Sequence, residues 1–316
     1  MREIGRLGYG AANVGNLYRA ITDDDAWQIL HTAWECGIRY FDTAPHYGLG
    51  LSERRLGAFL STKPRAEFTI STKVGRLLRP DPDGAGRLDD DHDFAVPADL
   101  KRVWDFTPEG VRSSLEESLE RLGLDSVDIV YLHDPERFDL RRGIDEGLPA
   151  LAKLREEGLV QAIGVGSMSP EALRTAASSG ILDLLMVAGR FTLADQSAAE
   201  AVISECRARK VRIVAAAVFN SGLLASPSPS VDSRFDYAPV RPELLDRVSR
   251  IADICADYGV PLPVAAVQYP LQEPSVISVV VGAATPDQVR QNVVNLEVDI
   301  PPELWVRLRD DGLVVL

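Results

Sequence analysis

Four side chains that could together move a proton lie at or just after short apolar runs. Asp42 and Tyr47 follow one run, Lys73 ends a second and His133 ends a third. A phenol ordinarily titrates at a pKa of about 10, a nearby ammonium favours the phenolate, and a carboxylate keeps that ammonium charged. We therefore expect a relay in which Asp42 supports Lys73, Lys73 lowers the pKa of Tyr47, and Tyr47 acts as acid or base. His133 would orient a carbonyl or hydroxyl oxygen.

Each of these residues also has an ordinary interpretation. A lone Lys or Asp at the end of a strand is usually solvated, and a lone Tyr in a loop is usually a surface aromatic. His31 in a helical pattern and His92 in an acidic loop receive only such an interpretation. The coincidence of residue type and position favours catalysis for the other four.

Short β-branched runs alternate with longer amphipathic segments along the chain, which predicts repeated strand–helix units. The helices are marked by N-cap residues followed by acids or proline, at Thr22, Thr107, Ser169 and Thr285, with Gly37 and Gly123 as helix ends. The predicted strands are 6–10, 39–42, 67–72, 126–132, 160–165, 182–187, 211–217 and 276–281.

Eight such units with near-continuous apolar strands predict an α/β fold, a closed (β/α)8 barrel of the TIM type. No G-x-G-x-x-G follows the first strand and no linker divides the chain, so we expect a single domain over 1–316 rather than a Rossmann unit. Two long segments, around 76–106 and 219–242, would lie at the mouth of the barrel with the four residues. They would serve as lids or pocket walls, or as plain solvated loops.

The bulk composition excludes several classes of protein. A net charge of −13 argues against nucleic-acid binding, because a phosphate backbone attracts clustered Lys and Arg. No apolar run is long enough to span a membrane, which favours a cytoplasmic protein. Cys36, Cys206 and Cys255 have no metal-ligand spacing, and the two in helical patterns, Cys36 and Cys255, are expected to be small buried residues.

Several motifs occur in a fixed order from about Gly8 to Asn292. They are Gly37-Ile-Arg-Tyr-Phe-Asp42-Thr-Ala-Pro-His-Tyr47-Gly, Ser52-Glu53, Leu56-Gly57, Ser71-Thr-Lys73-Val-Gly, Asp128-Ile-Val-Tyr-Leu-His133 and Ala162-Ile-Gly-Val165. Together they resemble the signature of the aldo-keto reductase family. The resemblance implies a (β/α)8 barrel, a nicotinamide cofactor extended across its mouth and no metal. It also implies that Asp42 orients, Tyr47 is the acid or base, Lys73 depresses its pKa and His133 orients the substrate.

Further motifs resemble the sugar-oxidising branch of that family, which includes D-threo-aldose (L-fucose), L-galactose and pyridoxal dehydrogenases. These motifs are Gly15-Asn-Leu-Tyr-Arg19, the stretch 43–55, Asp105-Phe106 ahead of Arg112-Ser-Ser-Leu-Glu, His133-Asp-Pro135, Ala188-Gly-Arg-Phe-Thr192 and Phe219-Asn-Ser-Gly222. The implied reaction oxidises the anomeric C1 hydroxyl of a sugar to a lactone, with Tyr47 as the base. His46 and Trp104 are candidate substrate contacts, a donor and a flat apolar wall, with ordinary loop packing as the alternative.

The resemblance also implies a set of cofactor-binding residues, with some departures from the family pattern. Gly166 and Ser167 replace a frequent Ser-Asn that holds the carboxamide, and Phe219 would have to stack on the nicotinamide because Ala216 occupies the usual aromatic position. The N-terminal hairpin of the family is expected to be absent or minimal. The implied cofactor residues are Gly10, Ala11, Ser167, Arg190, Phe219, Asn220, Ser221, Gly222, Gly282, Ala284, Thr285, Gln288, Gln291 and Asn292.

Two positions near the last of these bear on the choice of cofactor. Gly282 and Gln288 stand where NADPH-dependent relatives place Lys and Arg, and a 2′-phosphate requires a charged partner. NAD is therefore favoured, with NADP possible if Arg290 turns toward the site.

Three functions are compatible with these observations. The first is an NAD(P)-dependent aldose 1-dehydrogenase acting on a sugar of the L-fucose or L-galactose type. The second is an NADPH-dependent aldehyde, ketone or pyridoxal enzyme, and the third is a cofactor-binding regulatory subunit. We expect a small-molecule substrate and a monomer or weak homo-oligomer.

Overall fold

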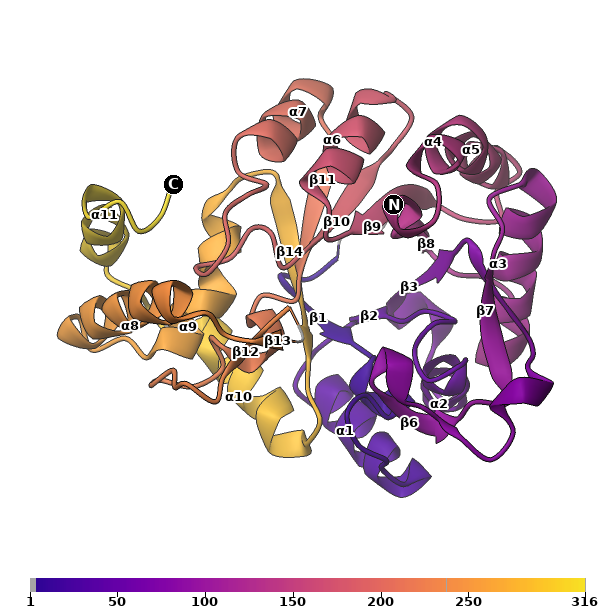
Figure 1. The fold of residues 1–316 in the computed structure, drawn as a ribbon, viewed down its shortest axis with the longest axis horizontal. Coiled ribbons are helices and arrows are strands. Elements are labelled where there is room, and N and C mark those ends of the chain that lie inside the picture. The colour runs from indigo at the N-terminus through magenta and orange to yellow at the C-terminus, as the bar shows by residue number, and fades with distance from the viewer. Residues whose placement is uncertain (1–3, 237, 316) are drawn as a thin grey trace.

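Eight parallel strands close into a barrel at the centre of the molecule (Figure 1). The computed structural model describes residues 4–236 and 238–315, and the strand order around the barrel is β1-β14-β11-β10-β9-β8-β3-β2. The eight predicted strands are confirmed with small shifts in their ends. They are β1 (Leu7–Gly10), β2 (Tyr40–Asp42), β3 (Thr69–Val74), β8 (Ile129–His133), β9 (Ala162–Ser167), β10 (Leu184–Ala188), β11 (Arg212–Ala216) and β14 (Val276–Gly282).

Helices surround the strands, as Figure 1 shows. The predicted N-cap residues are confirmed. Thr22 forms a capping box with Asp25, and the side chains of Thr107, Ser169 and Thr285 each accept a hydrogen bond from a backbone N–H in the first turn of their helix. The helices are α1 (Asp23–Glu35), α2 (Leu51–Leu60), α3 (Pro108–Leu122), α4 (Leu140–Arg142), α5 (Leu148–Glu156), α6 (Pro170–Ser178), α7 (Ala201–Arg209), α8 (Pro242–Asp257), α9 (Leu262–Gln268), α10 (Pro286–Glu297) and α11 (Pro302–Asp310).

The segment 76–106 is folded rather than an open loop. It contains an antiparallel pair of β4 (Arg76–Pro80) with β7 (Leu100–Trp104), and a shorter pair of β5 (Leu88–Asp89) with β6 (Phe94–Pro97). A bridge between Leu17 and Phe94 joins it to the segment after β1. The other long segment carries the small pair β12 (Arg234–Phe235) and β13 (Ala238–Pro239). Both segments therefore have the structure to form walls at the mouth.

The interior of the barrel combines apolar packing with a short polar chain. Tyr40 and Tyr131 are fully buried there, and their hydroxyl groups lie 3.3 Å apart. The Tyr40 hydroxyl lies 3.0 Å from Ser71 Oγ, and Ser71 donates a 2.7 Å hydrogen bond to Asp42. Burial raises the pKa of both phenols, so they stay protonated. This chain of hydroxyl groups therefore fixes the position of the Asp42 carboxylate.

Three other expectations concern the chain as a whole. The first expectation is that an N-terminal hairpin is absent or minimal. Residues 4–6, the described residues before β1, form no hairpin, and residues 1–3 lie outside the described part of the chain. Cys206 and Cys255 are buried, as expected for Cys255, whereas Cys36 is half-buried at the end of α1. Among the described residues, no helix is long and apolar enough to cross a membrane.

Candidate active site

The four predicted catalytic residues meet at the carboxyl end of the barrel. Asp42 ends β2, His133 ends β8, and Lys73 is the next-to-last residue of β3. Lys73 Nζ lies 2.6 Å from Asp42 Oδ2 and 4.8 Å from the centre of the Tyr47 ring. The rings of Tyr47 and His133 are perpendicular, with centres 6.1 Å apart. The topology thus brings together the residues that we call the tetrad.

The electrostatics of Tyr47 differ from the expectation. Burial raises the pKa of the Tyr47 phenol, and the nearby Lys73 ammonium opposes this without reversing it. The predicted role of Lys73 as a depressor has the right sign, but the predicted net lowering is wrong, because desolvation of the phenolate is the larger effect. For Lys73, burial acts against the charge, but Asp42 and Tyr47 outweigh it and raise its pKa. Tyr47 is therefore a protonated phenol beside a permanent cation.

The loop between Asp42 and Tyr47 is tied to the end of β1. Ala11 N donates to Asp42 O at 2.8 Å, and Ala11 O accepts from Ser52 Oγ at 2.7 Å. Ser52 Oγ also lies 2.8 Å from Thr43 Oγ1, and Thr43 O accepts from Lys73 Nζ at 2.9 Å. These bonds fix the start of the loop that carries Tyr47.

His46 and His133 face each other across the same space. Their ring centres are 5.7 Å apart, and His46 also contacts the ring of Phe94 at 5.5 Å. Burial, followed by the charge of Arg76, lowers the pKa of each imidazole well below its ordinary value. His46 Nδ1 is buried and has no partner among the described residues. Both rings are therefore neutral at pH 7, and His46, predicted to contact the substrate, lies beside Tyr47 and His133.

Trp104 lies beside the site but supports another side chain. The Arg76 guanidinium carbon lies 4.3 Å from the centre of the Trp104 ring. The Phe138 ring stacks parallel to the Trp104 ring, with ring centres 5.8 Å apart. Arg76 in turn forms an ion pair with Asp134, the residue after His133. No motif in the sequence marks this ion pair. The order of the strands could have suggested it, because Arg76 and Asp134 follow the adjacent strands β3 and β8.

Ser167, predicted to hold the carboxamide, is already engaged by a neighbouring carboxylate. Its Oγ donates a 2.6 Å hydrogen bond to Glu136 Oε1 and accepts one from Ser169 N at 2.8 Å. Glu136 Oε2 is buried without a partner among the described residues. Sequence analysis did not single out Glu136, although it follows His133 by three residues. The carboxylate takes the hydroxyl proton, so Ser167 can offer a ligand only an acceptor.

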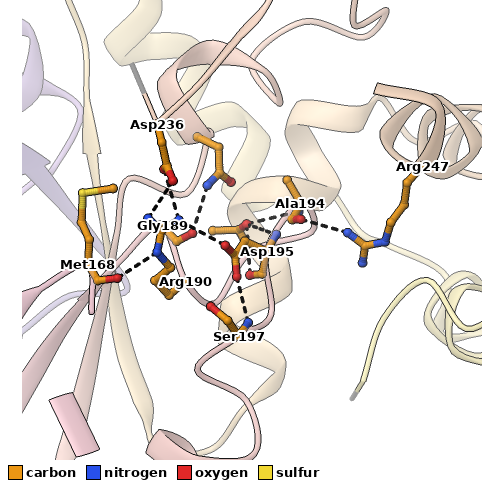
Figure 2. Close-up of polar contacts among 10 residues, drawn as sticks. Met168, Gly189, Arg190, Ala194, Asp195, Ser197, Asp236 and Arg247 are labelled. Atoms are coloured by element: carbon orange, nitrogen blue, oxygen red, sulfur yellow. Dashed lines mark hydrogen bonds and ion pairs between the residues drawn. The ribbon is translucent and has the colours of Figure 1, made fainter. Parts of the chain in front are cut away.

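Arg190 joins three segments, as Figure 2 shows. Its Nε donates to Met168 O at 2.8 Å, and its two Nη atoms contact Asp195 at 3.1 Å and Asp236 at 2.7 Å. Asp236 belongs to the segment 219–242, so the guanidinium fastens that segment to the mouth. A direct contact to a cofactor would have to share these hydrogen bonds.

The backbone after β11 has an unusual run of left-handed residues. Ala217, Asn220, Ser221 and Gly222 all have positive φ, and Phe219 packs partly against the core. Asn220 Nδ2 donates to Gly189 O at 3.0 Å, whereas its Oδ1 is buried and has no donor among the described residues. Strained backbone and an unpaired buried acceptor are features that bound ligands commonly explain.

The last predicted group lies where β14 leads into α10. Gly282 is paired with Gly10 across neighbouring strands, and Ala284 N donates to Gln288 Oε1 at 2.7 Å. Arg19, which the sequence analysis did not select, donates to Ala284 O at 3.0 Å. The other predicted side chains have contacts within this region: Thr285 caps α10, Gln291 bonds Asn295, and Asn292 is buried next to β1.

A cavity of about 580 Å³ lies among the segments that follow the barrel strands. It lies between the segment after β1, the β5–β6 pair and the segment 219–242, and Tyr18, Phe94, Ser221 and Arg234 line it. Phe94 connects it to the tetrad, since its ring centre lies 6.1 Å from that of Tyr47. The cavity has room for a small molecule, and Phe94 is a lining residue that also contacts the Tyr47 ring.

Comparisons with known proteins agree with this geometry. The chain is 57% identical to a D-threo-aldose 1-dehydrogenase from Pseudomonas sp, covering 98% of this chain and 94% of that protein. It is 38% identical to a pyridoxal 4-dehydrogenase from Microbacterium luteolum, with 98% and 94% covered. A glycerol dehydrogenase from Gluconobacter oxydans has the same fold, with a TM-score of 0.78 at 24% identity over 97% of this chain and 91% of that one. The profile of the Aldo/keto reductase family matches residues 6–310. The chain therefore belongs to the aldo/keto reductase family and is an oxidoreductase that uses a nicotinamide cofactor.

Proposed function

We propose that this protein oxidises the anomeric C1 hydroxyl of an aldose to a lactone, with NAD as the preferred hydride acceptor. The observation that carries the proposal is the assembled tetrad in a chain 57% identical, over nearly its full length, to a protein named for aldose 1-oxidation. Sugars of the L-fucose or L-galactose type are the candidate substrates.

In the proposed reaction the four tetrad residues handle the proton. The bound oxidised nicotinamide supplies the acceptor for the hydride that leaves C1. Neutral His133 hydrogen-bonds the C1 oxygen, and Tyr47 removes the hydroxyl proton as the C=O bond of the lactone forms. Lys73, 4.8 Å from the centre of the phenol ring, stabilises the phenolate form of Tyr47, and Asp42 keeps Lys73 charged and fixed.

The residues at the mouth fit a nicotinamide dinucleotide. Ser167 would accept the carboxamide N–H, because Glu136 holds its hydroxyl proton. Asn220 Oδ1, buried without a donor among the described residues, offers a second acceptor. The start of α10 suits the adenosine end, since a helix N-terminus favours phosphate groups. Phe219, Gly10, Ala11, Ser221, Gly222, Gly282, Ala284, Thr285, Gln291 and Asn292 remain proposed contacts, and Arg190 is proposed to act by fastening the segment 219–242.

The choice of NAD rests on the charges near Gln288. Gln288 is neutral, and its Oε1 is occupied by Ala284 N. Arg290, which could have bound a 2′-phosphate, is paired with Asp287 at 2.7 Å. Of the cations near this site, Arg19 bonds the carbonyl of Ala284. Neutral Gln288 and the paired Arg290 therefore offer a 2′-phosphate less than the charged fork that it prefers.

The substrate pocket is proposed to include His46, with Trp104 as an indirect contributor. His46 lies 6.0 Å from Tyr47 and 5.7 Å from His133 between ring centres, so a substrate held by those two residues would lie close to it. Trp104 carries Arg76 on its ring and shapes the wall through that cation. A monomeric or weakly associated state remains a prediction.

The test is NADH fluorescence after the protein is mixed with NAD and a panel of aldoses and pyridoxal. We expect turnover with at least one aldose and its loss in Tyr47→Phe, which should still bind NAD. Tyr258→Phe, a change on the surface at the end of α8, is the matched control. No turnover of any aldose, together with NADPH-driven reduction of simple aldehydes, would favour the reductase function instead.

A further inference from the structure

Asp134 places a carboxylate next to the predicted position of the reacting oxygen. It directly follows His133, and its Oδ2 lies 3.7 Å from His133 Nε2. Its charge also adds to the burial that raises the pKa of Tyr47. Asp134 has a φ of 44°, in the left-handed region that a non-glycine residue adopts at a cost. The backbone is held there by a 2.9 Å hydrogen bond from Asp134 N to Gly166 O.

A chain of side chains holds this carboxylate in place. Arg76 Nη2 donates to Asp134 Oδ2, and the Arg76 side chain is only 4% exposed. The guanidinium is supported from its other side by Trp104, on which Phe138 stacks. Arg137 Nη1 approaches the same Oδ2 at 4.0 Å from the surface. These contacts hold Oδ2 of Asp134 in place. Because the carboxylate is rigid, they also set the position of Oδ1.

The second oxygen of Asp134 is free to accept a hydrogen bond. Oδ1 accepts no hydrogen bond from the described residues. It is not fully buried, since the side chain is 15% exposed. An ionised carboxylate can only accept, so its natural ligand is a hydroxyl or amine donor. Oδ1 belongs to the carboxylate whose Oδ2 lies 3.7 Å from His133 Nε2, so His133 and Asp134 could reach oxygens on neighbouring carbons of one ligand.

We propose that Asp134, positioned by Arg76, binds the hydroxyl group on the carbon next to the reacting carbon of the substrate. This inference rests on the proposed function and narrows its substrate class to aldoses with a free hydroxyl at C2. His133 and Tyr47 would hold the C1 oxygen while Asp134 accepts the hydrogen of the C2 hydroxyl. A substrate without that hydroxyl forgoes a hydrogen bond to a charged group, so the same residue would favour aldoses over simple aldehydes and 2-deoxy sugars.

If Asp134 were only structural, its loss would reduce activity on all substrates equally. Comparing a sugar with its 2-deoxy analogue therefore separates a structural role from a role in recognition. The experiment measures kcat/KM with NAD for the best aldose and for its 2-deoxy analogue, in the unchanged protein and in Asp134→Ala. We expect the unchanged protein to prefer the C2-hydroxyl substrate by about 10- to 100-fold, as for a hydrogen bond to a charged group. In Asp134→Ala this ratio should fall close to one, through loss of activity on the hydroxylated sugar alone.

The controls separate folding and chemistry from recognition. Asp134→Ala leaves the Arg76 charge unpaired, so the double variant Arg76→Met with Asp134→Ala, which removes both charges, should show the same lost preference. Asp145→Ala, an exposed acid in the same connection, should keep the preference. Equal losses on both sugars in both variants, or a preference that survives them, would overturn the role of Asp134. Absence of any aldose oxidation by the unchanged protein would instead contradict the proposed function, and this inference with it.

Discussion

Lys73 Nζ lies 2.6 Å from Asp42 Oδ2, and both side chains are at most 3% exposed. An ion pair removed from water in this way is costly to form and more costly to break, because a single buried charge has no compensation. The pair is therefore a fixed electrostatic element beneath Tyr47, and Ser71 and Thr43 complete its hydrogen bonds.

Breaking this pair should destabilise the fold. We predict that Asp42→Ala lowers the free energy of unfolding by about 3–5 kcal/mol, because it leaves the Lys73 ammonium buried and unpaired. Urea unfolding followed by circular dichroism measures the change. Asp287→Ala, which breaks an exposed ion pair with Arg290, is the matched control and should leave the unfolding midpoint where it is. An equally stable Asp42→Ala variant would contradict the buried character of the pair.

The rate of sugar oxidation should rise with pH throughout the neutral and alkaline range. Burial raises the pKa of Tyr47 above its ordinary value of about 10, and the base form is the phenolate, so its fraction grows by about tenfold per pH unit below that pKa. His46 and His133 are neutral from below pH 6.5, so neither adds an inflection near neutrality. The measurement is kcat/KM between pH 6 and 10, and a plateau that begins near pH 7 would show that a different base is at work.

Stability should fall when the pH is lowered through the range in which ordinary histidines protonate. The pKa of His46 is well below 6.5 in the folded protein because of its burial, and it is about 6.5 in the unfolded chain. The unfolded chain therefore binds more protons below about pH 6.5, and the stability present above that pH is lost as the pH falls toward the folded value. His46→Gln should reduce the difference in Tm between pH 7 and pH 5, whereas His31→Gln, at an exposed position, should not. An unchanged difference in His46→Gln would refute this linkage.

Much of the barrel and the tetrad could be predicted from the sequence, because apolar runs mark the strands and the strand ends converge by topology. The pairing of β4 with β7 could not, since Arg76-Leu-Leu-Arg-Pro80 lacks a strand pattern and gains its order from a distant partner. The ion pair of Arg76 with Asp134 joins residues 58 positions apart, and only the adjacency of β3 and β8 in the barrel points to it. The net pKa shift of Tyr47 was also out of reach, because it depends on how deeply the folded chain buries the phenol.

One substitution should shift the cofactor preference from NAD toward NADP. Gln288→Arg supplies the charge that a 2′-phosphate needs, so NADP affinity should rise about tenfold or more. NAD affinity should fall slightly, because Ala284 N loses its bond to Gln288 Oε1. Dissociation constants from fluorescence titration test this, with Val294→Arg, an exposed position on the same helix, as a control for added charge. Unchanged NADP binding in Gln288→Arg would place the 2′ position elsewhere.

Oxidation at the anomeric carbon of an aldose can be tested by following that carbon itself. An aldose labelled with ¹³C at C1 is incubated with the protein and NAD while NADH is measured, and the product is followed by ¹³C NMR. We expect the labelled hemiacetal carbon to become a lactone carbonyl in step with NADH formation, and Tyr47→Phe to form neither. A label that stays at the hemiacetal while NADH accumulates would contradict oxidation at C1.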